Sequence, residues 1–209
     1  MTLRIIALHG QAGAGKDTFA DRLVDRHGFV KRGFADPLYE EVAAAYGVTV
    51  EWLRDRGRKE LPQPELALLV SKSDAFVESC VERHGFNFSD IGAPRSPRWT
   101  LEQWGTEYRR AQTNTYWLDR MSDFVASQPR DVAGVVIPDC RFLNEAQWVC
   151  RNLGSIYRVE RPGLKPVSSH VSALPLPDYV IERTIYNTGT ISLLHAIADF
   201  ASRAYARTA

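Results

Sequence analysis

Several features that mark other classes of protein are scarce or missing in this sequence. Its 209 residues include three cysteines without a CxxC pair, and neither a GxSxG nor an HExxH motif occurs. No apolar run approaches the ~20 residues that a membrane-spanning helix needs. Basic and acidic residues nearly balance, at a net charge of +1, so electrostatics predicts neither a nucleic-acid partner nor a membrane surface.

The cysteine count and the N-terminus favour a cytoplasmic location. An odd number of cysteines in a chain of ordinary composition predicts reduced thiols in a cytosol-like compartment. Residues 1–8 are too short for the apolar core of a signal peptide, and Arg4 interrupts them. The length fits one domain with room for an inserted lobe, and neither a repeat nor a low-complexity tract is present.

Residues 10–18 form the most informative stretch. An apolar run at residues 3–8 predicts a buried strand, and a helical pattern starts after Lys16. A strand, a loop with the spacing GxxxxGK and a helix make a P-loop, whose glycines let backbone amides approach phosphate oxygens. The residues assigned to a phosphate ligand are Gly10, Ala12, Gly13, Ala14, Gly15, Lys16, Asp17 and Thr18. The simpler alternative is an ordinary glycine turn.

The P-loop pattern has one departure. Asp17 stands where serine or threonine normally helps to hold Mg²⁺, and Thr18 comes one place later. A carboxylate is a good Mg²⁺ ligand, so Asp17 can serve. Alternatively, Thr18 supplies the hydroxyl and Asp17 only favours the helix N-terminus.

The rest of the chain predicts an α/β fold. Strands are expected near 3–8, 29–34, 132–137, 155–160 and 178–182, and the helical patterns between them imply a parallel sheet of about five strands with helices on both faces. Helices are expected over 65–83, 100–111, 115–126 and 190–205, and residues 86–97 should be a loop. The core would comprise residues 1–36 and 130–209, a helical lobe residues 37–127, and a lid-like, proline-rich loop residues 161–177.

Asp139 and Arg141 follow the apolar strand predicted at 132–137. An acid at the carboxyl end of a strand beside a P-loop fits a Mg²⁺-organising Walker-B residue, although Asp139 can also cap the next helix. Arg141 can grip a phosphate, or it can be a surface arginine on the first turn of that helix. A cation is disfavoured at a helix N-terminus, which favours the ligand-facing role.

Two other groups of residues are weaker candidates. Trp104 and Trp117 lie with Arg109 and Arg110 in a segment that can hold a planar base and its phosphate, yet tryptophans at helical spacing are more often core residues. The stretch at 161–177 carries cations, including Arg161 and His170, and is either a mobile lid or a plain surface connection. The other histidines show no ligand-like spacing.

Taken in order, the motifs resemble those of the bacteriophage-type deoxynucleoside monophosphate kinases, within the P-loop nucleoside monophosphate kinase group, over nearly the whole chain. The segments that carry this resemblance are GKDT at 15–18, FADPL at 34–38, WGTE at 104–107 with Arg110, YW at 116–117, PDCR at 138–141 with Glu145, VERPG at 159–163, His170, and NTGT at 187–190. The GKDT ending is typical of this family. One departure is Ala173, where relatives often carry an acid after the lid histidine.

The resemblance implies transfer of the ATP γ-phosphate to a dNMP, giving dNDP and ADP, with Mg²⁺ as the metal cofactor. It implies a catalytic role for Lys16, Arg110, Asp139 and Arg141, a Mg²⁺ role for Asp17 or Thr18 and for Asp139, and a helical acceptor-binding insertion. It further places Asn187 and Gly189 near the donor base. The acceptor nucleotide would be bound by Asp36, Trp104, Glu107, Arg110, Trp117 and Arg141.

Two other functions remain open at this point. One is a P-loop kinase that phosphorylates a hydroxymethylated pyrimidine within DNA, against which the near-neutral charge argues weakly. The other is a nucleotide-binding module without acceptor chemistry, against which Arg110 and Arg141 argue. The expected partners are nucleotides alone, with neither nucleic acid nor membrane, and the expected state is a monomer or homodimer in the cytoplasm, that of the host for a phage-encoded chain.

Overall fold

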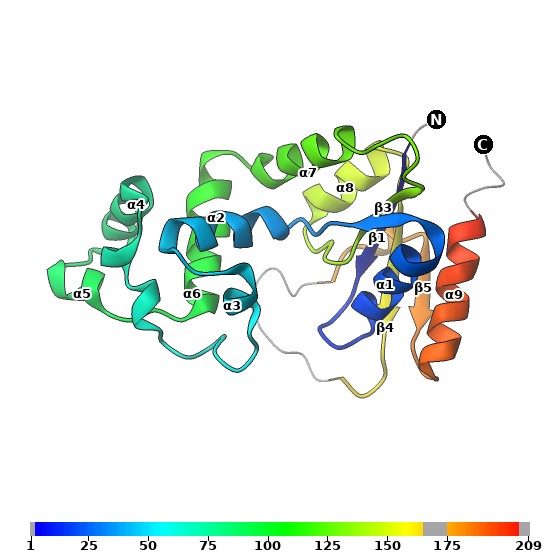
Figure 1. The fold of residues 1–209 in the computed structure, drawn as a ribbon, viewed down its shortest axis with the longest axis horizontal. Coiled ribbons are helices and arrows are strands. Elements are labelled where there is room, and N and C mark those ends of the chain that lie inside the picture. Colours follow the sequence, from blue (N-terminus) through cyan, green and yellow to red (C-terminus); the bar gives the residue numbers. More distant parts are fainter. Residues whose placement is uncertain (1–2, 165–174, 205–209) are drawn as a thin grey trace. The chain divides into compact units, whose positions relative to one another are not determined.

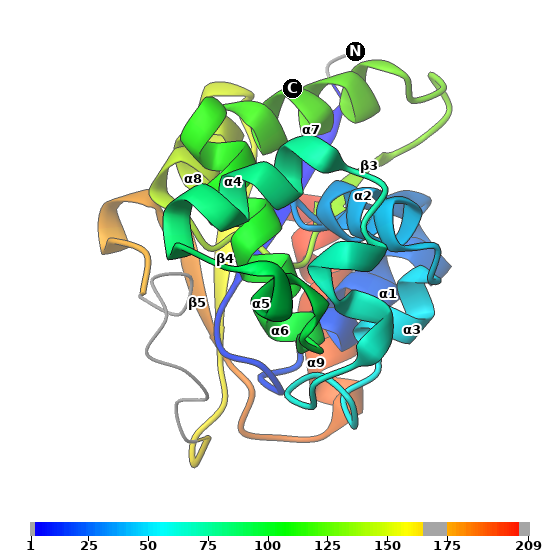
Figure 2. The same ribbon diagram turned by 90° about the vertical axis from the view of Figure 1, so that its left-hand side faces the viewer.

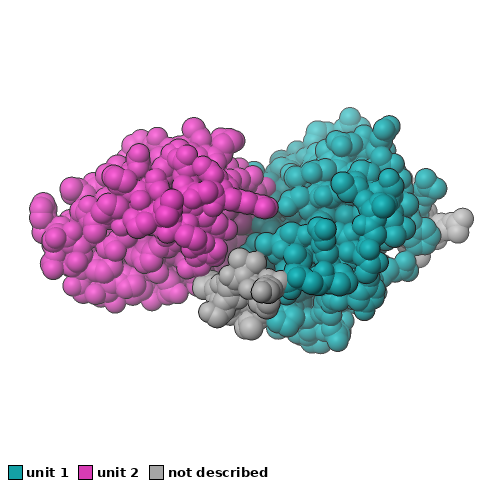
Figure 3. All heavy atoms as spheres, turned by 90° about the horizontal axis from the view of Figure 1, so that it is seen from below, with its two compact units in different colours: residues 1–34, 121–209 teal, residues 35–120 magenta. Residues whose placement is uncertain are grey.

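The computed structural model of the chain describes residues 3–164 and 175–204. These fall into two compact units (Figure 3). Unit 1 combines residues 1–34 with residues 121–209, and unit 2 is formed by residues 35–120. Within the described ranges, none of the helices is long and apolar enough to cross a membrane.

Unit 1 contains a five-stranded sheet in the order β2-β3-β1-β4-β5, with every neighbouring pair parallel. The strands are β1 (Arg4–His9), β2 (Phe29–Lys31), β3 (Gly134–Ile137), β4 (Ser155–Glu160) and β5 (Arg183–Tyr186). Figure 2 shows β4 and β5 running side by side. The predicted α/β fold with a five-stranded parallel sheet is confirmed.

Helices cover both faces of this sheet, because successive side chains of a strand point to opposite sides. Ile6 and Leu8 of β1 pack in one buried cluster with α1 (Lys16–His27) and α9 (Ile191–Ala204), which lie side by side (Figure 1). On the other face, α8 (Leu143–Arg151) contacts β1 and β4. Trp148 of α8 donates a hydrogen bond to Ser122 in the second half of α7 (Tyr116–Ala126).

The predicted strand at 178–182 is wrong in its position. The chain forms a 3-10 turn, η5 (Asp178–Val180), because the amide of Ile181 bonds back to the carbonyl of Asp178. Pairing with β4 then begins at Glu182, whose amide donates to Ile156, and continues through β5. The strand predicted at 29–34 is shorter, ending at Lys31, and β3 starts at Gly134 rather than at 132.

Unit 2 is helical. Its elements are α2 (Asp36–Tyr46), α3 (Val50–Arg54), η1 (Pro64–Leu66), η2 (Leu68–Val70), α4 (Asp74–His84), α5 (Phe88–Gly92), α6 (Pro97–Glu102), the π-helix η3 (Gln103–Arg110) and the first half of α7. They enclose a core of their own, in which Phe76, Trp104 and Tyr108 lie ring against ring.

Two helix predictions and one loop prediction in unit 2 need correction. The helix predicted at 65–83 is two 3-10 turns followed by α4, which starts where the Ser73 hydroxyl accepts the amide of Phe76. The loop predicted at 86–97 contains α5, capped by Asn87. The helix predicted at 100–111 starts at Pro97 and continues as the π-helix η3.

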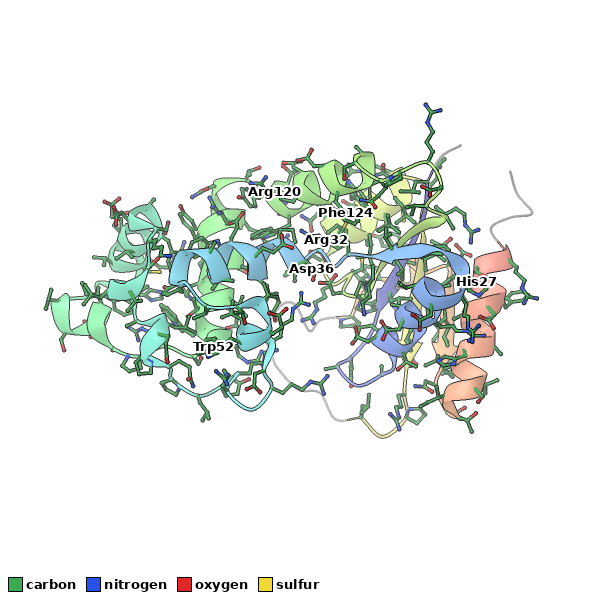
Figure 4. The ribbon with its side chains drawn as sticks, in the orientation of Figure 1. His27, Arg32, Asp36, Trp52, Arg120 and Phe124 are labelled. Carbon is green, nitrogen blue, oxygen red and sulfur yellow. The ribbon has the colours of Figure 1, made fainter. Side chains whose placement is uncertain are left out.

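A charged cluster fastens α9 to α1 on the side of His27 (Figure 4). Asp199 accepts two hydrogen bonds from Arg22, at 2.8 and 2.7 Å, and one from His27 at 2.7 Å. The bonds from Arg22, followed by that from His27, hold the pKa of Asp199 well below its ordinary value. Such a carboxylate stabilises the fold above its ordinary pKa, and that stabilisation is lost as the pH falls toward the lowered value.

We therefore expect Asp199→Asn to lower the free energy of unfolding at neutral pH, and the difference from the wild type to shrink as the pH falls below about 4. Urea denaturation at a series of pH values measures this. The matched control is Asp21→Asn, which removes a more exposed α1 carboxylate paired with Lys31 and should cost less at neutral pH. A difference for Asp199→Asn that is independent of pH would contradict the electrostatic explanation.

Candidate functional site

The P-loop joins β1 to α1 at the carboxyl edge of the sheet. Gly10 has a φ of 137°, and a Cβ atom there would lie 2.2 Å from the carbonyl oxygen of Val159, so only glycine fits. Gly15, with a φ of 104°, stands at the N-cap of α1. Because glycine has no side chain to cap the first turn, the amides at this helix end can be offered to an anion.

Lys16 folds back over the loop. Its ammonium group donates to the carbonyl oxygens of Gly10 and Gln11, both at 2.8 Å. Burial lowers the pKa of Lys16, the charge of Arg141 lowers it further, and Asp17 and Asp139 oppose the shift. The lysine is thus held in the loop by two neutral acceptors, which a polyphosphate can replace with charged oxygens.

The turn at residues 138–142 leaves β3 beside the P-loop, because β3 is paired in parallel with β1. The Cys140 amide donates to the carbonyl of Leu8 at 3.1 Å. The buried carboxylate of Glu145 accepts the amides of Arg141 at 2.8 Å and Phe142 at 3.0 Å. These bonds hold the backbone of a turn on which the Arg141 side chain is exposed.

Asp139 is held from the neighbouring strand. Its Oδ1 atom accepts the amide of Phe34 at 2.8 Å, and a Cβ atom on Gly33 would lie 2.7 Å from its Oδ2 atom. Gly33 therefore makes room for the carboxylate where the chain leaves β2. Asp139 does not cap the following helix, since the N-cap of α8 is Phe142.

Four charged side chains gather at this edge of unit 1. Arg141, Asp17 and Asp139 all act electrostatically on Lys16, so one further cation and two carboxylates surround the P-loop lysine. Among the described residues, no group of three or more histidine, cysteine, aspartate or glutamate side chains is placed to bind a metal ion. Two carboxylates and the Thr18 hydroxyl nevertheless provide only oxygen donors, the set that suits a Mg²⁺ ion completed by water and phosphate.

The turn between β5 and α9 supports the P-loop. Asn187 donates from its side-chain amide to the carbonyl of Ala14 at 2.8 Å, and Gly189 is exposed. Ala14 is buried, whereas Ala12 and Gly13 are exposed. Asn187 thus lies against the P-loop, and its predicted contact with the donor base remains a prediction.

In unit 2 the two tryptophans predicted to bind the acceptor are core residues. Trp104 and Trp117 are 2% and 3% exposed, and the Trp117 ring nitrogen donates to the Gly105 carbonyl. Burial on this scale favours the core alternative over direct stacking on a base. Gly105 packs on Leu38, where a Cβ atom would lie 2.9 Å from a leucine methyl group.

Glu41 of α2 organises the side chains around these tryptophans. Its carboxylate accepts hydrogen bonds from Trp104 at 2.9 Å, from Arg109 at 2.8 Å and from Tyr116 at 2.5 Å. The Arg109 guanidinium also lies 4.8 Å from the centre of the Tyr116 ring. Both of these partners of Arg109 lie within unit 2, which favours a structural role over that of a phosphate ligand.

The other predicted acceptor residues of unit 2 are more accessible. Asp36 is the first residue of α2 and pairs with Arg54 at 2.5 Å. Glu107 pairs with Arg83 at 2.8 Å, and Arg110 is half-buried at the end of the π-helix. Of the two lid residues, Arg161 is exposed just after β4, and His170 lies outside the described residues.

Three residues that support the site were not predicted to do so. His9 bonds the Cys140 carbonyl, Glu145 holds the turn before α8, and Glu41 joins α2 to the π-helix. Glu145 has a sequence signal, since it stands three residues after the N-cap Phe142. His9 and Glu41 have none, because their partners lie far away along the chain.

No protein-family model matches the chain. A putative deoxynucleotide monophosphate kinase of Acanthamoeba polyphaga mimivirus is 27% identical to it, over 82% of this chain and 81% of the relative. The deoxynucleoside-5'-monophosphate kinase of Escherichia phage T5 is 28% identical, over 68% of this chain and 70% of the relative. Among solved structures, dephospho-CoA kinase from Campylobacter jejuni aligns over 98% of both chains at 14% identity and a TM-score of 0.45.

These relatives confirm the resemblance inferred from the motifs. Both similar sequences carry the name of a deoxynucleotide or deoxynucleoside monophosphate kinase, and the match extends over most of the chain. The prediction of an ATP-dependent nucleotide kinase agrees with both names.

The Glu145 carboxylate should be necessary for the stability of the turn that carries Arg141. We expect Glu145→Ala to lower the free energy of unfolding by about 1–3 kcal/mol, because it leaves two amides without an acceptor. Glu145→Gln keeps an acceptor oxygen and should cost less. Urea denaturation measures both variants, and equal losses would show that the charge of Glu145, rather than its two hydrogen bonds, provides the stabilisation.

Proposed function

We propose that this chain transfers the γ-phosphate of ATP to a deoxynucleoside monophosphate, giving a deoxynucleoside diphosphate and ADP. The observation that carries this proposal is the convergence of the P-loop, Lys16, Asp139 and Arg141 at one edge of the sheet. The names of the two relatives support the choice of acceptor.

On the donor side, the P-loop amides and Lys16 hold the ATP phosphates. The phosphates replace the Gly10 and Gln11 carbonyls as acceptors of the Lys16 ammonium group. The transferring phosphoryl group carries most of the charge in the transition state, so catalysis needs alignment and positive charge and requires no protein nucleophile. Lys16 and Arg141 supply that charge in this proposal.

A magnesium ion fits the oxygen donors of this edge. Asp139, anchored by the Phe34 amide, and Asp17 or Thr18 would hold it, directly or through water. When bound, the ion would neutralise charge on the phosphates. The protein provides the two carboxylates from separate elements, Asp17 from α1 and Asp139 from the turn after β3.

On the acceptor side, we assign the nucleotide to unit 2. Asp36, Glu107 and Arg110 are the accessible candidates, and Arg110 would bind the acceptor phosphate. Trp104 and Trp117 would act indirectly by holding the π-helix that carries Glu107 and Arg110. Arg161 is a further candidate for the phosphates, from the chain just after β4.

A panel of common and modified dNMPs with labelled ATP tests the proposal. We expect labelled dNDP from at least one member. Lys16→Ala should lower kcat/KM by a factor of about 100 or more, since it removes a full charge from the transferring group. Its melting temperature without ligand should change little, because Lys16 bonds only two loop carbonyls.

The matched control for charge is Lys31→Ala, on the edge strand β2 and paired with Asp21, which should leave the rate unchanged. Transfer only to hydroxymethylated duplex DNA would replace the dNMP assignment by a DNA kinase. If ATP binds, no acceptor is phosphorylated and Arg141→Ala changes nothing, the chain is a nucleotide-binding module.

Asp17→Ala should raise the Mg²⁺ concentration needed for half-maximal activity, because an exposed carboxylate next to Lys16 is lost. Titration of activity with Mg²⁺ at fixed ATP measures this, and Asp21→Ala on the same helix is the control. If the Mg²⁺ titration is unchanged for Asp17→Ala and shifted for Thr18→Ala, the hydroxyl of Thr18 holds the ion instead.

A further inference from the structure

His9 is a buried histidine at the end of β1, immediately before the P-loop. Its Nδ1 atom lies 3.0 Å from the carbonyl oxygen of Cys140, and its Nε2 atom lies 3.2 Å from the backbone nitrogen of Leu176. A carbonyl can only accept a hydrogen bond, and a backbone amide can only donate one. Both contacts are satisfied together only by a neutral ring that carries its proton on Nδ1.

The surroundings of His9 favour that neutral form. Burial lowers the pKa of His9, whereas its bond to the Cys140 carbonyl opposes the shift. Three cations also lower it: Arg158 on β4, Lys16 on α1 and Arg141 on the turn after β3. A charged imidazolium would have to stand next to all three and would lose its acceptor for the Leu176 amide.

Each partner of His9 belongs to a segment that leaves the carboxyl edge of the sheet. The Cys140 carbonyl lies in the turn that carries Asp139 and Arg141. Leu176 lies just before η5, and its own carbonyl accepts from Arg158 at 2.6 Å. His9 therefore joins the start of the P-loop to two other loops of the same edge.

The bond between His9 and the Cys140 carbonyl joins a side chain of β1 to the turn that carries Arg141. Leu8 binds the Cys140 amide, and Glu145 binds the next two amides. A swing of the Cys140 peptide would move Arg141, the next residue. The His9 bond opposes that swing from the strand that leads into the P-loop.

We propose that His9 is a positioning residue for phosphoryl transfer. As a neutral Nδ1–H tautomer it fixes the Cys140 carbonyl relative to the P-loop and so aims Arg141 at the transferring phosphate, and its Nε2 atom holds the Leu176 backbone. The proposal rests on the role of Arg141 in the proposed function. It assigns a task to a histidine that makes no contact with the reacting atoms.

Substitution of His9 by asparagine or by glutamine tests its two hydrogen bonds one at a time. In His9→Asn the amide nitrogen lies near the position of Nδ1 and can still donate to Cys140, whereas the shorter side chain loses Leu176. In His9→Gln the amide oxygen reaches toward the position of Nε2 and can accept from Leu176, whereas the Cys140 bond is lost. Neither amide side chain titrates, so both variants stay uncharged at this position.

We expect His9→Gln to lower kcat with the best dNMP by about tenfold or more and to change KM for ATP less than threefold. Loss of the bond to Cys140 should disturb the alignment of Arg141 with the transferring phosphate more than it disturbs the binding of ATP. His9→Asn should keep kcat within about threefold of the wild type. His27→Asn, a control at the far end of α1, should reduce the melting temperature without reducing kcat. The proposal is overturned if His9→Gln keeps its kcat, or if both His9 variants lose kcat equally.

A second measurement is independent of catalysis. Nitrogen chemical shifts of ¹⁵N-histidine-labelled protein at pH 7.5 should identify His9 as the neutral Nδ1–H tautomer, and the Arg141 amide should exchange with solvent faster in His9→Gln than in His9→Asn. An Nε2–H tautomer, a charged ring or equal exchange in the two variants would overturn the positioning role. If the wild type phosphorylates no dNMP, the proposed function fails, whereas the ring state and the amide exchange still decide whether His9 holds the turn.

Discussion

Parallel pairing of β1 with β3 and β4 is the constraint on which the site depends. Parallel strands release their following loops at one edge of the sheet, so the P-loop and the turn at 138–142 must emerge next to each other although more than a hundred residues separate them. The close approach of Gly10 to the Val159 carbonyl then sets the path of the loop. The pairing of β1 with β3 thus brings the turn that carries Asp139 and Arg141 beside the P-loop.

The proximity of Lys16 and Arg141 is electrostatically unfavourable, and backbone carbonyls partly offset this repulsion. Burial lowers the pKa of Lys16, and repulsion from Arg141 lowers it further. Loop carbonyls solvate the ammonium group, and Asp17 and Asp139 act in the opposite direction to Arg141. The arrangement is best satisfied when a polyanion is bound, which is the state in which the proposed enzyme works.

Unit 2 is held together by hydrogen bonds to Glu41 and by aromatic contacts with Phe76. A π-helix leaves its side chains at unusual spacing, and here Trp104, Tyr108 and Arg109 converge on Glu41 and Phe76. The half-buried carboxylate of Glu41 accepts hydrogen bonds from three donors, and the loss of one of them would weaken the network. Such a network supports the π-helix, which carries the residues that we propose for the acceptor nucleotide.

The sequence by itself determined the fold class, the P-loop and the order of the motifs, because glycine spacing and apolar runs are local signals that survive without a structure. It misplaced β5, since residues 178–182 are apolar enough for a strand and only the hydrogen bonds of η5 rule one out. It also left the tryptophans undecided between core and ligand. Tertiary structure alone decided these points, together with the hydrogen-bond partners of His9 and Glu41, because those partners lie far away along the chain. The partners of His9 lie 131 and 167 residues away along the chain, a separation at which no pattern of residues indicates contact.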